Sequence, residues 1–157
     1  MELFLSHASK DAQAVGMVRV QVEALGVQVY LAEHDNQAGD RLSAKVEQAI
    51  SRCDAMLVLL TASGYDSRYV QQEIGFAKGR GKLIIPLLDP ALTNADLGLL
   101  DDIEYILFDS GSPSDGLARL GERVDALARQ NKATQEQALM LVAAVALIAL
   151  LIYMDRG

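Results

Sequence analysis

The sequence predicts an α/β fold, a five-stranded parallel sheet with helices on both faces, followed by a C-terminal transmembrane helix. Short apolar runs alternate with segments whose apolar residues recur at helical spacing, which is the pattern of parallel strands joined by crossover helices. Residues 55–60 are continuously apolar, as expected for a central strand covered on both faces. Residues 138–154 carry no charge or side-chain amide and are apolar on every side, so they have no single face to pack on a domain.

Composition limits the kinds of partner and site. The 157 residues suffice for one domain with a proper core. The formal net charge of −7, without a basic stripe, argues against nucleic acid as a partner. The one cysteine, Cys53, lies between a helical stripe and an apolar run, so we expect a buried, inert thiol in a reducing compartment. The first residues do not have a signal-peptide pattern, so we expect the N-terminal domain to stay in the cytoplasm.

The strands of the predicted sheet are short apolar runs bounded by polar or turn residues. They are expected at residues 2–5, 27–31, 55–60, 82–88 and 104–108. Pro86 cannot donate to a sheet ladder, so we expect it near a strand end. Right-handed crossovers place the loops after parallel strands along one edge of the sheet, where ligands bind in such folds. The loops expected there are 6–10, 33–40, 61–65 and 89–94.

Helices are predicted where apolar residues recur three or four positions apart. They are expected from Ser9 to Leu25, from Leu42 to Cys53, over 66–78 and over 114–130. Ser9 and Asp40 can cap the first two, and Asp66 or Ser67 can cap the third. Gly26 is expected to end the first helix, as glycine does at the C′ position. The segment between 89 and 102 is irregular, with room for a short helical turn.

One carboxylate in the third predicted helix, Glu73, has no obvious partner in the sequence. An average helical glutamate is a solvated surface charge. Glu73, however, lies two turns into its helix, and the N-terminal lean of helical side chains directs it toward the edge where ligands bind. Tyr69 lies one turn earlier on a neighbouring face.

Several other functional motifs are excluded. The G-x-G at 79–81 follows a helix and leads into a strand, which is the reverse of a dinucleotide fingerprint. No aspartate ends the third strand, as a phosphoacceptor receiver domain would require. His7 and His34 are far apart and have no cysteine or carboxylate at ligand spacing, so we expect no metal site. The G-x-S-x-G elbow of α/β-hydrolases is also absent from the sequence.

With these residues in view, the chain resembles a Toll/interleukin receptor (TIR) domain of bacterial type over about residues 2–130, which implies a flavodoxin-like fold. The first strand leads into a segment similar to the family's first box, Phe4-Leu5-Ser6-His7. Residues 35–50 resemble its long loop after the second strand and the helix that follows. Residues 67–73 resemble its aromatic-Cys/Val-x-x-Glu segment.

The chain departs from the family pattern at several positions. Tyr69 replaces the commoner tryptophan and Val70 the commoner cysteine, although the spacing to Glu73 is unchanged. Ala38-Gly39 stands where many members have Pro-Gly, and Glu2 where the first box often has aspartate. The late Phe-Trp box is not apparent.

The resemblance implies an enzyme that cleaves the nicotinamide–ribose bond of NAD+, its substrate, and needs no cofactor. Glu73 is the implied catalytic carboxylate. Nicotinamide leaves as a neutral base while positive charge develops on the ribose, so one carboxylate stabilises the transition state without help from a second acid. The residues expected to meet the substrate are Ser6, His7, Ser9, Lys10, Gly39, Asp40 and Tyr69.

Other functions stay open at this point. TIR enzymes commonly complete the NAD+ site by packing the loop at 33–40 against the next copy, so the resemblance also implies self-association in signalling or antiviral defence. One alternative is a non-catalytic interaction module that signals by self-association at the membrane. Another is an effector that gathers its tails to disturb the bilayer. The sequence does not distinguish linear, cyclic or conjugated ADP-ribose as the product.

The predicted organisation is a TIR domain at 1–130, a polar linker at 131–137 and a transmembrane helix at 138–154, started by a capping box at Thr134. The Leu, Ile and Val residues of the last segment favour insertion by on the order of −4 kcal/mol. Basic residues concentrate before it, which predicts a single-pass anchor with the TIR domain in the cytoplasm. The alternative is a buried oligomerisation helix.

Overall fold

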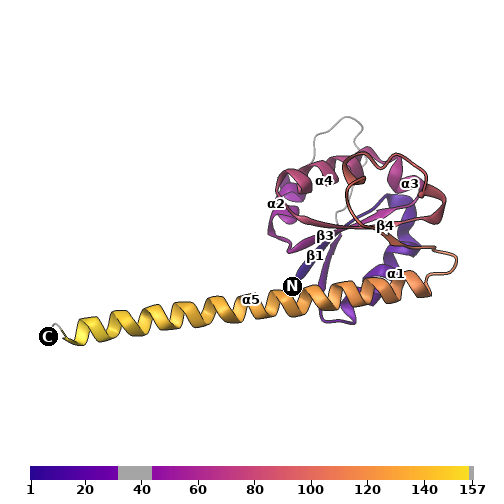
Figure 1. Cartoon of the computed structure of the whole chain (residues 1–157). Coiled ribbons are helices and arrows are strands. Elements are labelled where there is room, and N and C mark those ends of the chain that lie inside the picture. Colours follow the sequence, from indigo (N-terminus) through magenta and orange to yellow (C-terminus); the bar gives the residue numbers. More distant parts are fainter. Residues whose placement is uncertain (32–43, 156–157) are drawn as a thin grey trace. The chain divides into compact units, whose positions relative to one another are not determined.

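A computed structural model describes residues 1–31 and 44–155 and shows the predicted α/β fold (Figure 1). The strands are β1 (Glu2–Ser6), β2 (Gln28–Leu31), β3 (Ala55–Leu60), β4 (Leu83–Leu88) and β5 (Ile106–Leu107). The helices are α1 (Ala12–Glu23), α2 (Ala44–Arg52), α3 (Ala62–Tyr65), α4 (Arg68–Gly79) and α5 (Ser114–Asp155). Short 3₁₀ turns are η1 (Ser9–Asp11), η2 (Pro90–Leu92) and η3 (Gly98–Leu100), so the irregular segment at 89–102 contains two short helical turns where one was expected.

The five strands pair in parallel in the order β2-β1-β3-β4-β5. The chain therefore winds outward from β1 to β2 and then in the other direction from β3 to β5. The point of reversal lies between β1 and β3, and ligands of doubly wound sheets bind outside the carboxyl ends of the strands at such a point. Ser6, the last residue of β1, pairs there with Val58 of β3.

Each face of the sheet has its own buried layer, because alternate residues of a strand point to opposite sides. Phe4 and Met56 belong to the core cluster that α2 and α4 complete. Leu3 and Leu5, which alternate with Phe4, are also fully buried. Figure 1 shows α2 and α4 on one side of the sheet and α1 on the other, which confirms helices on both faces.

One of three predicted helix boundaries is confirmed, and two are wrong. Ser67 caps α4, and its hydroxyl accepts from the N–H of Val70 at 3.4 Å. Helix α1 ends at Glu23 with Ala24 as its C-cap, so Gly26, with φ of 73°, turns the chain two positions beyond the cap and does not occupy the predicted C′ position. Ser9 does not cap α1, because it begins the 3₁₀ turn η1, and Asp11 precedes α1 without a side-chain cap hydrogen bond.

Pro86 lies inside β4, paired with Val58, so its predicted place at a strand end was wrong. The sheet tolerates it because β5 pairs only with Leu87 and Leu88. At the level of Pro86, β4 therefore has β3 as its one described neighbour, so Pro86 lies at what is locally an edge of the sheet, where proline is tolerated. The same limited pairing makes β5 shorter than the predicted strand at 104–108.

The predicted loop at 61–65 contains the short helix α3. Thr61 caps it, because its Oγ1 accepts from the N–H of Gly64 at 3.1 Å. The same hydroxyl donates to a carboxylate oxygen of Asp11 at 2.8 Å. This contact ties the turn after β1 to the helix after β3 at the carboxyl edge of the sheet.

Gly64→Ala is expected to destabilise this edge by about 2–3 kcal/mol, the cost of overpacking a close contact. A Cβ at Gly64 would lie 2.3 Å from the carbonyl oxygen of Leu59, which is backbone and cannot rotate away. Gly16 is the matched control, because a Cβ there meets nothing within 4 Å. Gly16→Ala should stabilise α1 by up to about 1 kcal/mol. Urea denaturation of the full chain in detergent measures both, and equal changes would contradict the packing at Gly64.

Helix α5 runs without a break from Ser114 to Asp155, across two compact units, Met1–Val124 and Asp125–Gly157. In the first unit it buries Leu120 and Val124. The prediction that a new helix starts at Thr134 was wrong. Its hydroxyl donates to the carbonyl oxygen of Gln130 at 3.0 Å, as threonines do inside helices, so the residues of the predicted linker are helical.

The second unit presents the apolar segment predicted to cross a membrane. Its most apolar window has a mean hydropathy of 2.5 and is not buried. Leu139 is 72% exposed and Val145 60%, which is costly in water and favourable in lipid. Among the described helices, α5 is the one long and apolar enough to span a bilayer by length and composition.

Candidate functional site

Glu73 of α4 and Ser6 of β1 meet at the carboxyl end of the sheet. The apolar residues Val70, Ile74 and Ala77 are buried and fix the rotation of α4 against the sheet. Glu73 lies on the margin of this apolar stripe, so it is turned inward with its neighbours. Both Glu73 and Ser6 are 0% exposed, which excludes the interpretation of Glu73 as a solvated surface charge.

The hydroxyl of Ser6 donates to Oε2 of Glu73 at 2.5 Å. Burial raises the pKa of the Glu73 carboxyl from 4.5 to about 7, and the hydrogen bond from Ser6 acts in the opposite direction. A carboxyl group that titrates near neutral pH can stabilise positive charge in its ionised form or exchange a proton with a bound group. Such groups are more frequent at functional sites than in ordinary cores.

Because the pKa of Glu73 is raised by folding, Glu73→Gln should stabilise the protein at high pH. The neutral carboxyl stabilises the fold below about pH 4.5, and this contribution is lost as pH rises through about 7. The shift corresponds to roughly 3 kcal/mol. The stability of Glu73→Gln relative to wild type should therefore increase by about that amount between pH 4 and pH 8. Denaturation at both pH values measures it, with the exposed Glu122→Gln as control. A pH-independent difference would contradict the raised pKa.

The other predicted site residues lie in different places. Tyr69 is half-buried, one turn before Glu73 on α4. His7 directly follows Ser6, and its Nδ1 lies 3.1 Å from the carbonyl oxygen of Leu5. Ser9 and Lys10 are exposed on η1, whereas Ser6 and Glu73 are buried. Gly39 and Asp40, with the predicted cap at Asp40, lie outside the described residues.

Sequence reasoning did not select Gln72 as a site residue. Its side-chain Oε1 is buried without a hydrogen-bond partner among residues 1–31 and 44–155. A buried amide oxygen normally has a partner, so each exception is a candidate contact for a polar ligand. Gln72 lies three positions after Tyr69, on the same flank of α4. This three-residue spacing from Tyr69 was the feature of the sequence that could have identified Gln72 as a candidate site residue.

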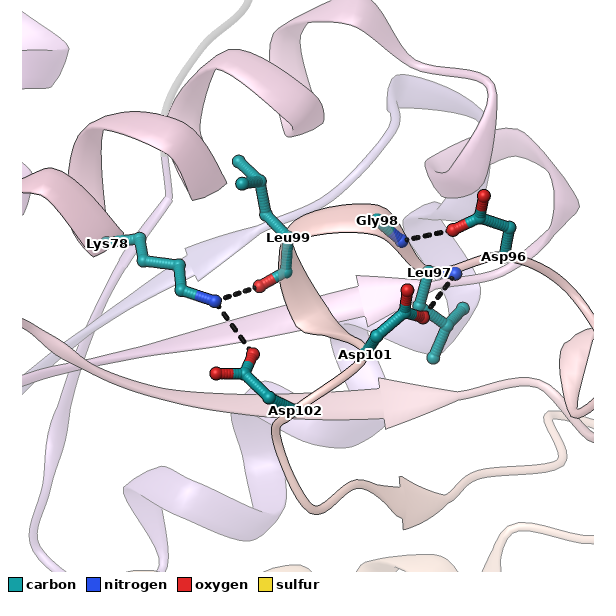
Figure 2. A network of polar contacts seen from close by, with 7 residues as sticks. All are labelled: Lys78, Asp96, Leu97, Gly98, Leu99, Asp101 and Asp102. Carbon is teal, nitrogen blue, oxygen red and sulfur yellow. Dashed lines mark hydrogen bonds and ion pairs between the residues drawn. The ribbon is translucent and has the colours of Figure 1, made fainter.

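The far flank of α4 is held by a polar network around η3 (Figure 2). Lys78 donates to the carbonyl oxygen of Leu99 at 2.5 Å and to the carboxylate of Asp102 at 2.7 Å. Asp96 and Asp101 each accept from a backbone N–H of the same segment. These groups are exposed, so we interpret the network as a structural clamp that positions α4.

Two further expectations concern reactive groups. Cys53 is buried, and burial raises the pKa of its thiol to about 11, so it is protonated and inert near neutral pH. Within the described ranges, no group of His, Cys, Asp and Glu side chains is arranged to hold a metal ion.

Comparisons with known proteins identify relatives of the fold. The model of the TIR domain family matches residues 3–121. The chain is similar to the structure of Clostridium botulinum CMP N-glycosidase, BcmB, with a TM-score of 0.53 and 23% identity, covering 76% of this chain and 97% of that one. It is also similar to the TIR domains of the activated Roq1 resistosome directly recognizing the pathogen effector XopQ, with a TM-score of 0.50 and 16% identity, covering 82% and 83% of the two chains. No curated protein matches.

Proposed function

This chain belongs to the TIR domain family, and we propose from that membership that it is a membrane-anchored NAD+ glycohydrolase with Glu73 as its catalytic carboxylate. The observation that carries the proposal is the inward-facing Glu73, hydrogen-bonded to Ser6 at the switch point of the sheet. Ligands of doubly wound sheets bind at this point. The similarity to a CMP N-glycosidase concerns the fold, and it gives a second nucleotide with an N-glycosidic bond to test.

The proposed reaction breaks the bond between ribose C1′ and the nicotinamide nitrogen. The bonding electrons go to nicotinamide, which leaves as a neutral base, and positive charge develops on the ribose. Ionised Glu73 stabilises that charge in a site of low dielectric, where a fixed carboxylate has a larger effect than in water. Water then adds to C1′ and releases a proton, which gives ADP-ribose. Attack by the adenine base in place of water would give a cyclic product.

The buried state of Glu73 adds one requirement to this reaction. Its side chain is 0% exposed, so a ribose reaches the carboxylate only after neighbouring side chains move apart. Contacts between copies of the chain are one source of free energy for such a change. The proposal therefore includes self-association of TIR domains, with the apolar part of α5 confining copies to a membrane and raising their effective concentration.

Activity should consequently depend on protein density. Turnover per molecule is expected to rise as the full chain is reconstituted at increasing protein-to-lipid ratios, because assembly is second order or higher in protein. The measurement is NAD+ consumption per molecule across a wide range of densities in vesicles. Constant turnover would mean that one copy contains a complete site.

A non-catalytic TIR scaffold is the second candidate function, and one observation favours it. The Ser6–Glu73 pair is fully buried and hydrogen-bonded, as a structural polar pair in a core would be. A scaffold would self-associate at the membrane and leave NAD+ intact. Activity measurements therefore distinguish the two functions.

The decisive experiment incubates the full chain, reconstituted in vesicles at high density, with NAD+ and separately with CMP. Mass spectrometry identifies the products. We expect free nicotinamide and an ADP-ribose product from NAD+. If the protein releases cytosine from CMP but leaves NAD+ intact, the proposed substrate is wrong, but the proposed cleavage of an N-glycosidic bond stands. Intact nucleotides at all densities, from a protein shown to be folded and associated, would favour the scaffold.

A further inference from the structure

Ser6 donates the hydrogen bond of its side-chain hydroxyl to the carboxylate of Glu73. It is the last residue of β1, is 0% exposed, and its Oγ lies 2.5 Å from Oε2 of Glu73. A serine hydroxyl has one proton to donate, so Ser6 cannot donate at the same time to a substrate.

The surroundings of the pair are apolar. Phe4, two residues before Ser6 on the same face of β1, and Val58, its partner on β3, belong to the buried cluster beneath α4. Val70 and Ile74 of α4 belong to the same cluster. Such surroundings disfavour a charged carboxylate, whereas a hydrogen bond donated to it favours the charged form. Ser6 therefore opposes the effect of burial on Glu73.

We propose that Ser6 is a positioning residue, which orients the Glu73 carboxylate and stabilises its charged form for bond cleavage. This inference rests on the proposed function. It assigns Ser6 to Glu73 in place of the direct substrate contact that the family resemblance implies.

The titratable side chains within four residues of the pair are Glu2, His7, Lys10 and Tyr69. Glu2 lies at the opposite end of β1, and Lys10 is exposed. Tyr69 and His7 are half-buried. A shift in Glu73 titration on changing Ser6 is assigned to the hydrogen bond only if Tyr69→Phe and His7→Asn do not reproduce it.

The test uses the full chain in detergent with its glutamate carboxyls labelled with ¹³C. The signal of Glu73 is the one missing from Glu73→Gln. Ser6→Ala should move the titration midpoint of Glu73 upward by about one pH unit, since hydrogen bonds to charged groups contribute on that scale. Ser6→Thr keeps the hydroxyl and should titrate like wild type. Ser51→Ala is the matched control, because the Ser51 hydroxyl donates to the Glu47 carbonyl oxygen within α2, at 2.7 Å.

Kinetics provide the second readout, on the nucleotide that wild type cleaves. A midpoint moved from about 7 to about 8 lowers the charged fraction at pH 7 about fivefold, so kcat should fall at least fivefold there. KM should change little, because Ser6 does not touch the substrate. Ser6→Thr should restore kcat.

The two proposals fail differently. If wild type cleaves neither nucleotide, the proposed function fails, while the titration still decides whether Ser6 controls Glu73. An unchanged midpoint in folded Ser6→Ala, or a changed midpoint without loss of kcat in an active enzyme, overturns the role of Ser6. If Ser6→Ala does not fold, Ser6→Cys replaces it. Its thiol is a weaker donor, so an intermediate upward shift is expected and an unchanged midpoint overturns the proposal.

Discussion

Glu73→Gln is expected to lower the rate of N-glycosidic bond cleavage at pH 8 by a hundredfold or more, with the fold retained. Glutamine has nearly the same size, and its side-chain oxygen can still accept the hydrogen bond from Ser6. The substitution removes only the charge that faces the developing positive charge on the ribose. Loss of one preorganised electrostatic contact of this kind costs about 3 kcal/mol in the transition state.

The measurement is kcat/KM for nicotinamide release by the full chain, compared with Glu122→Gln, which changes an exposed glutamate of α5. The wild-type rate should fall as pH drops through about 7, because the carboxylate of Glu73 is protonated there. The small residual rate of Glu73→Gln should lose this pH dependence. Undiminished cleavage by a folded Glu73→Gln protein would remove Glu73 from the mechanism.

The same substitution has opposite effects on stability and activity if both proposals hold. Burying a carboxyl group in the apolar cluster beneath α4 opposes folding above pH 7, where it must ionise. If Glu73 served only as a core residue, Glu73→Gln would increase stability above pH 7 relative to wild type, and no catalytic activity would be lost. A gain in stability together with a loss of cleavage is the usual sign of a strained functional group.

The layered fold was predictable because hydrophobic periodicity is local. Continuous apolar runs identified β1, β3 and β4, and helical stripes identified α1, α2 and α4. Three details of the fold were not predicted from this local periodicity. The four residues of α3 are too few to show a stripe, Pro86 is tolerated because β5 is short, and the polar residues before 138 continue α5 without a break.

The candidate site was predictable only in part, because some of its features depend on contacts between residues far apart in the sequence. Glu73 could be placed near the ligand-binding edge from its position in one helix. Its partner Ser6 is 67 residues away in sequence, and their hydrogen bond depends on how α4 packs over β1. Burial, which raises the pKa of Glu73, is likewise a property of the packed domain. The sequence motif was therefore enough to select Glu73, whereas its hydrogen bond to Ser6 could be identified only from the folded structure.

The second large effect is expected in the apolar segment of α5. Lysine at both Val145 and Ile148, near its centre, should release the full chain from membranes. Each lysine at the centre of a spanning helix costs about 2.5–3.5 kcal/mol, against on the order of −4 kcal/mol for the whole segment, so the sum becomes unfavourable. Both side chains are more than half exposed, so the substitutions disturb no packing among the described residues.

The measurement is flotation of the full chain with vesicles after alkaline extraction. Wild type should float, and the double lysine variant should remain in the unbound fraction. Gln130→Lys with Thr134→Lys is the matched control, because it adds the same charge to the same helix at exposed polar positions before the apolar segment. That variant should float like wild type. If the Val145→Lys and Ile148→Lys chain also floats, the segment does not cross the bilayer, and α5 must bind membranes or other copies by its surface.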